Sequence, residues 1–159
     1  MPTEYAIEMK GITKTFGSVV ANRDVELNVR QGEILALLGE NGSGKTTLMN
    51  MLSGIYAPDQ GEILVDGKPA SIASPEDAKR LGIGMVHQHF KLVDVFSAAD
   101  NIWMGQEKAG FLLRRSRYDV ISETAKKFGF ELDPKKKVQN MAVSEKQTLE
   151  IIKVLCYGA

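Results

Sequence analysis

A short glycine-rich segment carries the clearest chemical signal in this chain. Residues 39–46 read Gly-Glu-Asn-Gly-Ser-Gly-Lys-Thr, which satisfies the spacing G-x-x-x-x-G-K-[ST] of a phosphate-binding loop. Glycines such as Gly42 and Gly44 let main-chain N–H groups approach phosphate oxygens closely. Lys45 would reach the β- and γ-phosphates, and Thr46 would offer its hydroxyl to a magnesium ion. These residues predict a site for a nucleoside triphosphate with Mg²⁺.

The flanking sequence provides the structural context that this motif needs. Residues 34–38 are all apolar, which predicts a strand buried on both faces, within a parallel sheet covered by helices. Residues 47–52 predict a helix that begins near Lys45 and points its positive end at the anion. The residues of this region expected to bind the nucleotide are Gly39, Asn41, Gly42, Ser43, Gly44, Lys45, Thr46 and Thr47.

The first third of the chain is β-rich. Val25, Leu27 and Val29 alternate with polar residues, which predicts a strand with one buried face. Residues 63–65 and 68–72 predict a hairpin that turns at Asp66-Gly67, and a further strand is expected at residues 83–86.

Helical patterns dominate after Phe96, and one helix is predicted before it. Ser74 would cap a helix that begins at Pro75 and ends at Gly82. Further helices are predicted at residues 97–104, 117–128 and 144–156. Ser144 and Gln147 have the spacing of a capping box at the start of the last helix.

Composition and charge exclude several classes of protein. The chain has 159 residues with 20 basic and 20 acidic side chains, so its net charge gives no reason to expect a nucleic-acid partner. Cys156 is the only cysteine, which excludes an intrachain disulfide and fits a reducing compartment. There is no apolar stretch of bilayer length and no pattern of a secretory signal, so we expect a cytoplasmic protein without direct membrane insertion.

Five motifs in order along the chain resemble the nucleotide-binding domain of ABC transporters. They are Lys14-Thr15-Phe16-Gly17, Val29-Arg30-Gln31-Gly32-Glu33, the phosphate loop, Pro58-Asp59-Gln60-Gly61 and Gly84-Met85-Val86-His87-Gln88. The resemblance covers nearly all of the chain. Residues 87–90, 99–102 and 150–155 look most like the ATPase subunits of importers for simple sugars or nucleosides.

The resemblance implies roles for two residues outside the loop. Phe16 would stack on the adenine base, because a flat apolar ring can stack without hydrogen bonds. Gln88 would contact the magnesium ion and the attacking water, because its amide can coordinate through oxygen and donate through nitrogen. Gln88 is therefore the expected catalytic residue and, with Thr46, an expected metal contact.

Residues 141–145 resemble a degenerate form of the ABC signature, which usually reads Leu-Ser-Gly-Gly-Gln. Ala142 replaces the usual serine, and Val143 and Ser144 replace the two glycines. The resemblance implies that Ser144 and Glu145, at the start of a helix, face the γ-phosphate of a nucleotide bound by a second subunit.

Partners and location follow from the same resemblance. Two such domains would enclose two ATP molecules and drive membrane permease subunits, which would dock near Phe90, Leu92 and Phe96. The chain would then be peripheral at the inner face of the cell membrane. The family pattern continues past Ala159 into a strand that ends in an aspartate and the catalytic glutamate, so we expect an amino-terminal portion that is inactive alone.

We therefore predict an α/β fold with an incomplete P-loop NTPase core. An antiparallel β subdomain and part of that core would occupy residues 1–96, and a helical subdomain residues 97–159. The expected function is MgATP binding and hydrolysis that powers uptake of a sugar- or nucleoside-like solute. Two other classes stay open: a non-catalytic nucleotide-binding module, and a small-molecule kinase with Arg114, Arg115 and Arg117 as its lid.

Overall fold

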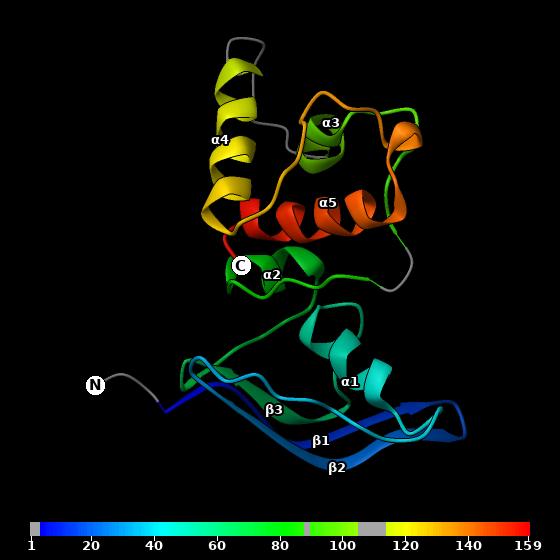
Figure 1. Cartoon of the computed structure of the whole chain (residues 1–159). Coiled ribbons are helices and arrows are strands. Elements are labelled where there is room, and N and C mark those ends of the chain that lie inside the picture. Colours follow the sequence, from blue (N-terminus) through cyan, green and yellow to red (C-terminus); the bar gives the residue numbers. More distant parts are fainter. Residues whose placement is uncertain (1–3, 88–89, 105–113) are drawn as a thin grey trace. The chain divides into compact units, whose positions relative to one another are not determined.

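The computed structural model describes residues 4–87, 90–104 and 114–159 (Figure 1). The chain separates into two compact units, Met1–Ile83 and Gly84–Ala159. Each unit has a hydrophobic core of its own. This division follows Ile83, whereas the boundary between the β and α/β region and the helical subdomain, expected between residues 96 and 97, stays a prediction.

The first unit is built on a four-stranded antiparallel sheet. Its strands are β1 (Tyr5–Phe16), β2 (Val19–Arg30), β3 (Gln60–Val65) and β4 (Lys68–Pro69), in the order β2-β1-β3-β4. The predicted alternation in β2 is confirmed, because Val25, Leu27 and Val29 are half-buried and the residues between them are exposed. The long β1–β2 hairpin forms most of the sheet (Figure 1).

A tight turn joins β3 to β4, as the sequence predicted. Asp66 and Gly67 have positive φ values of 50° and 71°, and Val65 pairs with Lys68 across the turn. A two-residue turn of this kind favours Asp-Gly because both residues lie in the left-handed region. The second strand of the hairpin is shorter than predicted and ends at Pro69.

Two helices contribute to the core of the first unit: α1 (Lys45–Leu52) and α2 (Pro75–Arg80). The core combines residues of the sheet, of both helices and of one loop, namely Met9, Ile12, Leu48, Met51, Ile63, Ile72 and Ala78. Ser74 caps α2 as predicted, because its Oγ accepts a hydrogen bond from the Asp77 N–H at 3.2 Å. Pro75 takes the first helical position, where its missing N–H has no cost.

Two strands that the sequence predicted are not formed. Residues 34–38 and 83–86 have no strand conformation, and no strand among the described residues pairs with them. Ile34 is 99% exposed and Leu38 88%, so this apolar segment is not buried. A strand needs a neighbour that takes up its main-chain donors and acceptors, which apolar side chains alone do not supply. The predicted parallel sheet is therefore absent from the part of the chain that the structure describes.

The second unit is helical. It contains α3 (Ala98–Trp103), α4 (Arg114–Lys127), the short 3-10 helix η2 (Val138–Asn140) and α5 (Val143–Cys156), so the three helices predicted here are confirmed with slightly different ends. At the centre of the core are the fully buried residues Ala98, Ile102, Ile121, Val138, Leu149 and Ile152. None of the helices described in either unit is long and apolar enough to cross a bilayer.

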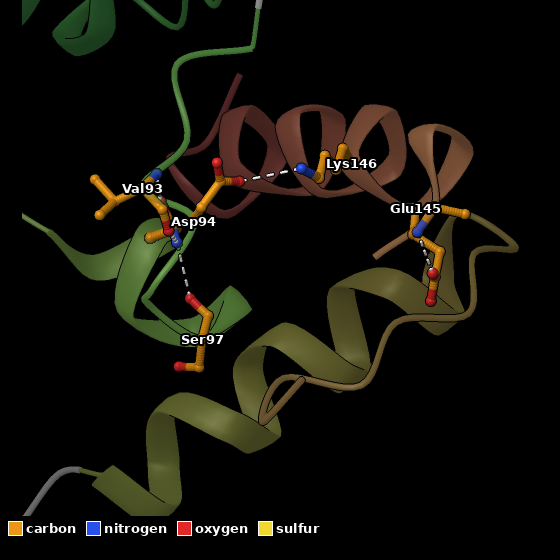
Figure 2. Close-up of polar contacts among 7 residues, drawn as sticks. Val93, Asp94, Ser97, Glu145 and Lys146 are labelled. Carbon is orange, nitrogen blue, oxygen red and sulfur yellow. Dashed lines mark hydrogen bonds and ion pairs between the residues drawn. The ribbon is translucent and has the colours of Figure 1, made fainter. Parts of the chain in front are cut away.

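Polar side chains fix the segment that precedes α3 (Figure 2). Asn101 of α3 is fully buried, and its Oδ1 accepts a hydrogen bond from the Val93 N–H at 2.7 Å. Its Nδ2 donates to the carbonyl oxygens of Val93 and Ser97, both at 3.0 Å. From α5, Lys146 Nζ lies 3.1 Å from Asp94 Oδ1. The Asn101 amide uses its acceptor and both donors, and so ties the main chain at Val93 and Ser97 to α3.

Candidate nucleotide-binding site

The predicted phosphate loop enters α1 through a left-handed turn. Gly44 caps the helix with φ 86° and ψ 0°. A Cβ at Gly44 would lie 2.3 Å from the Ala21 carbonyl oxygen of β2, so only glycine fits between the loop and this strand. Asn22 Nδ2 also donates to the Gly44 carbonyl oxygen at 3.4 Å. Strand β2 therefore fixes the point at which α1 begins.

Oxygen atoms of the phosphate loop surround the ammonium group of Lys45. Its Nζ donates to the carbonyl oxygens of Gly39 and Glu40, both at 2.7 Å, and to Ser43 Oγ at 3.2 Å. A Cβ at Gly39 would lie 2.9 Å from Ser43 Oγ and 3.7 Å from Lys45 Nζ, so the inside of the loop has no room for a further side chain. An ammonium group at a helix start suits phosphate, whose oxygens accept hydrogen bonds from the cation and from main-chain N–H groups.

The other predicted loop ligands are open to solvent. Asn41, Gly42, Ser43 and Thr46 are exposed, and Thr47 is half-buried. Thr46 follows Lys45 as the second residue of α1. This arrangement fits the predicted magnesium contact, which stays a prediction.

Phe16, the predicted base-stacking residue, ends β1 and is 43% exposed. Its ring forms a T-shaped pair with Tyr56, with 5.1 Å between ring centroids, and Lys14 Nζ lies 5.6 Å from the Phe16 centroid. Lys14 of β1 pairs with Asn22 of β2, which is the residue that bonds Gly44. Phe16 is two residues farther along the strand, or about 7 Å. The Phe16 ring and the phosphate loop therefore lie at the same end of the hairpin.

The start of α5 differs from the predicted capping box. The helix begins at Val143 with Ala142 as its N-cap, so Ser144 is the second helical residue and not the cap. The Glu145 side chain caps the helix instead, because its Oε2 accepts a hydrogen bond from the Ala142 N–H at 2.8 Å (Figure 2). A carboxylate in the first turn is favoured by the positive end of the helix, whereas the Ser144–Gln147 pattern starts two residues too late.

Glu145 is also paired with a lysine of its own unit. Lys136 Nζ donates to its two carboxylate oxygens at 2.6 and 2.9 Å. Chiefly through this bond, and also through the Ala142 N–H, the pKa of Glu145 is held below its ordinary value. Ser144, by contrast, is exposed. The roles predicted for Ser144 and Glu145 toward a second subunit stay predictions.

Gln88, the predicted catalytic residue and metal contact, lies outside the described residues. Its neighbour His87 is described, and burial lowers the pKa of this imidazole. In the described ranges, no group of three or more His, Cys, Asp or Glu side chains could hold a metal ion. The predicted metal contacts thus remain Thr46 and Gln88.

The three apolar residues expected near a permease differ in exposure. Phe90 is 36% exposed and Phe96 41%, whereas Leu92 packs against the helical core. The two phenylalanines are therefore the better candidates for a contact with a partner.

The arginines considered for a kinase lid belong to α4. Arg117 has its guanidinium 5.8 Å from the ring centroid of Trp103, so it stacks on an aromatic residue of its own unit. The side chains of Arg114 and Arg115 lie outside the described residues.

Sequence reasoning missed Asp59 as a neighbour of the predicted base site. Its Oδ1 accepts a hydrogen bond from Lys14 Nζ, and its Oδ2 accepts from the N–H and the Oγ1 of Thr15, all at 2.7 Å. These bonds, that of Lys14 first, lower the pKa of Asp59 to about 2. The signal in the sequence is the turn at Pro58-Asp59-Gln60-Gly61, which gives the place of the carboxylate but not its partners on β1.

Comparisons with known proteins give consistent results. A family model described as ABC transporter matches residues 22–159. The guanosine import ATP-binding protein NupO of Bacillus subtilis (strain 168) is 48% identical over 158 residues, which cover 98% of this chain and 31% of that protein. The nucleoside import ATP-binding protein NupA of Lactococcus lactis subsp. cremoris (strain MG1363) is 46% identical over 161 residues, which cover 100% of this chain and 32% of that protein. The chain thus spans about a third of the length of these relatives.

Solved structures share the fold. MJ1267, an ATP-binding cassette of an ABC transporter, superposes with a TM-score of 0.83 at 20% identity, over 98% of this chain and 66% of that one. CbiO1 from Clostridium perfringens, part of the ABC transporter complex cbiONQ, has a TM-score of 0.78 at 25% identity, over 97% and 62% of the two chains. The predicted fold class, an incomplete P-loop NTPase core with an antiparallel β region and a helical region, is confirmed. Since the family model matches most of its residues, this chain belongs to the ABC transporter family.

Proposed function

We propose that this chain is the amino-terminal, MgATP-binding part of an ATPase subunit that powers import of a nucleoside- or sugar-like solute. The observation that carries the proposal is the phosphate loop, in which Lys45 Nζ is held by Gly39, Glu40 and Ser43 at a helix start. The names of two relatives, which describe guanosine import and nucleoside import, support the class of solute.

Different residues of the first unit would bind the phosphates, the base and the magnesium ion. Main-chain N–H groups of the loop and the Lys45 ammonium bind phosphate oxygens, and the Phe16 ring stacks on the base. The Thr46 hydroxyl holds the magnesium ion, which neutralises phosphate charge when bound. The contacts named here come from the β1–β2 hairpin, the loop and α1.

The second unit would supply contacts to partners. Ser144 and Glu145 at the start of α5 face a nucleotide bound by a second nucleotide-binding domain, and Phe90 and Phe96 face the membrane permease subunits. Gln88 contacts the magnesium ion and the attacking water. Through the permease, the protein sits on the cytoplasmic face of the membrane without entering it.

Hydrolysis belongs, in this proposal, to the parent protein. This chain spans 31% of the guanosine import ATP-binding protein, and the catalytic glutamate of the family pattern would come from the remainder. The chain alone then acts as a nucleotide-binding module without catalysis. This second function is favoured over a kinase because Arg117 stacks on Trp103.

Calorimetry of the purified chain tests the proposal directly. Wild-type chain is titrated with MgATP, beside Lys45→Ala and the matched control Lys10→Ala, which removes a half-buried lysine of β1 that pairs with Glu8. We expect saturable binding by wild type and by Lys10→Ala and none by Lys45→Ala, with no phosphate release from ATP. A folded wild-type chain that does not bind MgATP would contradict the binding site, and steady phosphate release would contradict the assignment of catalysis to the parent protein.

A further inference from the structure

We propose that Asp59 and Tyr56 are positioning residues for the nucleotide base, because together they hold the Phe16 ring in the place where it stacks. This inference rests on the nucleotide binding proposed above. It extends the base site from one aromatic residue to three side chains, two of which come from the segment between α1 and β3.

Asp59 fastens the end of β1 through four hydrogen bonds. Its carboxylate accepts three of them, from Lys14 Nζ and from the N–H and Oγ1 of Thr15. Its own N–H donates to the Thr13 carbonyl oxygen at 2.9 Å. All four reach the three residues that immediately precede Phe16, so the position of the ring depends on the Asp59 side chain.

The strand ladder holds this part of β1 on one side only, where Thr15 pairs with Val20 and Phe16 with Val19 of β2. The pairing of β1 with β2 shifts register between Ile12 and Lys14 and again between Lys14 and Thr15, and the pairing with β3 ends at Thr13. Irregular pairing leaves main-chain groups without regular partners. The Asp59 carboxylate supplies the acceptor for the Thr15 N–H in their place.

Tyr56 acts on the ring itself. The T-shaped pair, with 71° between the ring planes, uses at most one face of Phe16. Phe16 is 43% exposed and Tyr56 37%, so a second flat ring can approach. Lys14 Nζ lies near the same ring, and Asp59 balances its charge at 2.7 Å. An aromatic ring that is held by its neighbours and is still 43% exposed is suited to stack on a base.

The hydrogen bonds of Asp59 require a carboxylate at this position. Both Asp59 oxygens accept, one from a cation and the other from two donors on Thr15, which an asparagine cannot reproduce because its amide nitrogen only donates. Asp66, at the other end of β3, offers a matched comparison. Its Oδ1 accepts one hydrogen bond, from Gln31 Nε2 at 2.6 Å, which an asparagine oxygen preserves.

The test separates the base from the phosphates by using two probes, MgATP and magnesium tripolyphosphate, in calorimetric titrations of the whole chain. Phe16→Ala should raise the Kd for MgATP about tenfold through lost stacking. Asp59→Asn and Tyr56→Leu should each raise it about threefold to fivefold, because the ring is less well held. The Kd for tripolyphosphate should stay at the wild-type value in all three variants, and Asp66→Asn should change neither. In a Phe16→Ala background, Asp59→Asn should have no further effect on MgATP.

Other outcomes overturn the inference in distinguishable ways. An equal loss of affinity for MgATP and for tripolyphosphate in Asp59→Asn would show a general defect of the fold. An unchanged Kd for MgATP in Asp59→Asn or Tyr56→Leu would remove that residue from the base site. A wild-type chain that binds tripolyphosphate as tightly as MgATP would refute base stacking while the phosphate loop stands. A wild-type chain that binds neither probe would refute the proposed function and the base site together.

Discussion

The Glu150 carboxylate accepts a hydrogen bond from the Lys91 main-chain N–H at 2.8 Å, although Glu150 of α5 is only 3% exposed. Lys91 opens the segment whose middle is held by Asn101 of α3. One buried acid and one buried amide, from two different helices, therefore fix a segment that forms no regular element. Because such groups are costly when unpaired, the pairing makes this conformation specific.

Glu150→Ala should destabilise the helical unit. The substitution leaves the Lys91 N–H without its acceptor and leaves a cavity where the buried Glu150 side chain was. We expect a cost of about 1–3 kcal/mol in the free energy of unfolding. Urea unfolding followed by fluorescence of Trp103, the single tryptophan, measures this unit. Glu150→Gln keeps an acceptor oxygen and should lose less. Glu131→Ala, at an exposed position, should unfold like wild type, and a Glu150→Ala curve equal to it would contradict the assigned role.

Two glycines of the phosphate loop should respond differently to alanine. Gly42→Ala meets no atom within 4 Å and carries only the backbone cost of φ 84°, about 1–2 kcal/mol. Gly44→Ala adds a Cβ 2.3 Å from the Ala21 carbonyl oxygen, so either β2 or the loop must move and nucleotide binding is lost. Thermal unfolding and MgATP titration of both variants check this. Equal binding by the two would show that the contact with β2 is not needed.

The pH dependence of the first unit should reflect Asp59. Its folded-state pKa is lowered from 3.8 to about 2, chiefly by Lys14. A lowered pKa means that this acid stabilises the fold above the unfolded-state pKa, and that the contribution disappears as the pH falls from about 4 through about 2. An NMR titration of the Asp59 carboxyl carbon should give a midpoint near pH 2. A midpoint at the ordinary value would contradict the three hydrogen bonds, and Asp59→Asn should flatten the loss of stability in this pH range.

The exposed apolar segment at residues 34–38 should promote self-association of the chain. Ile34 and Leu38 are 99% and 88% exposed, and burial of such side chains between molecules is favourable. The double variant Ile34→Lys/Leu38→Lys should weaken self-association at least about tenfold. Sedimentation velocity at several concentrations measures this. Val95→Lys, which changes another exposed apolar residue, is the control, and an equal effect there would assign the association to another surface.

The features that the sequence predicted well are those with a local cause. Ser74 caps α2 and Asp66-Gly67 turns the hairpin because each depends on its own φ and ψ values and on neighbours within three residues. The phosphate loop is equally local, since the contacts of Lys45 reach no farther than Gly39. Its position against β2 was not readable from the sequence, because Ala21 is distant along the chain.

The features that the sequence missed depend on partners far along the chain. Residues 34–38 satisfy the pattern of a buried strand, but a pattern does not provide the neighbouring strand. Glu145 caps the helix through the Ala142 N–H in place of the Ser144–Gln147 pair, and its other partner, Lys136, is nine residues earlier in the chain. Asp59 and Lys14 are 45 residues apart and meet only once β3 lies against β1.

The three acceptors around Lys45 Nζ keep the phosphate loop folded before any nucleotide arrives. The oxygens of an incoming phosphate would replace carbonyl oxygens that already surround the ammonium group. The loop would not have to become ordered first. In the proposed function, nucleotide association would not wait for this loop to fold. After release, the same three acceptors would be available to the ammonium, so an empty loop would be ready for the next nucleotide.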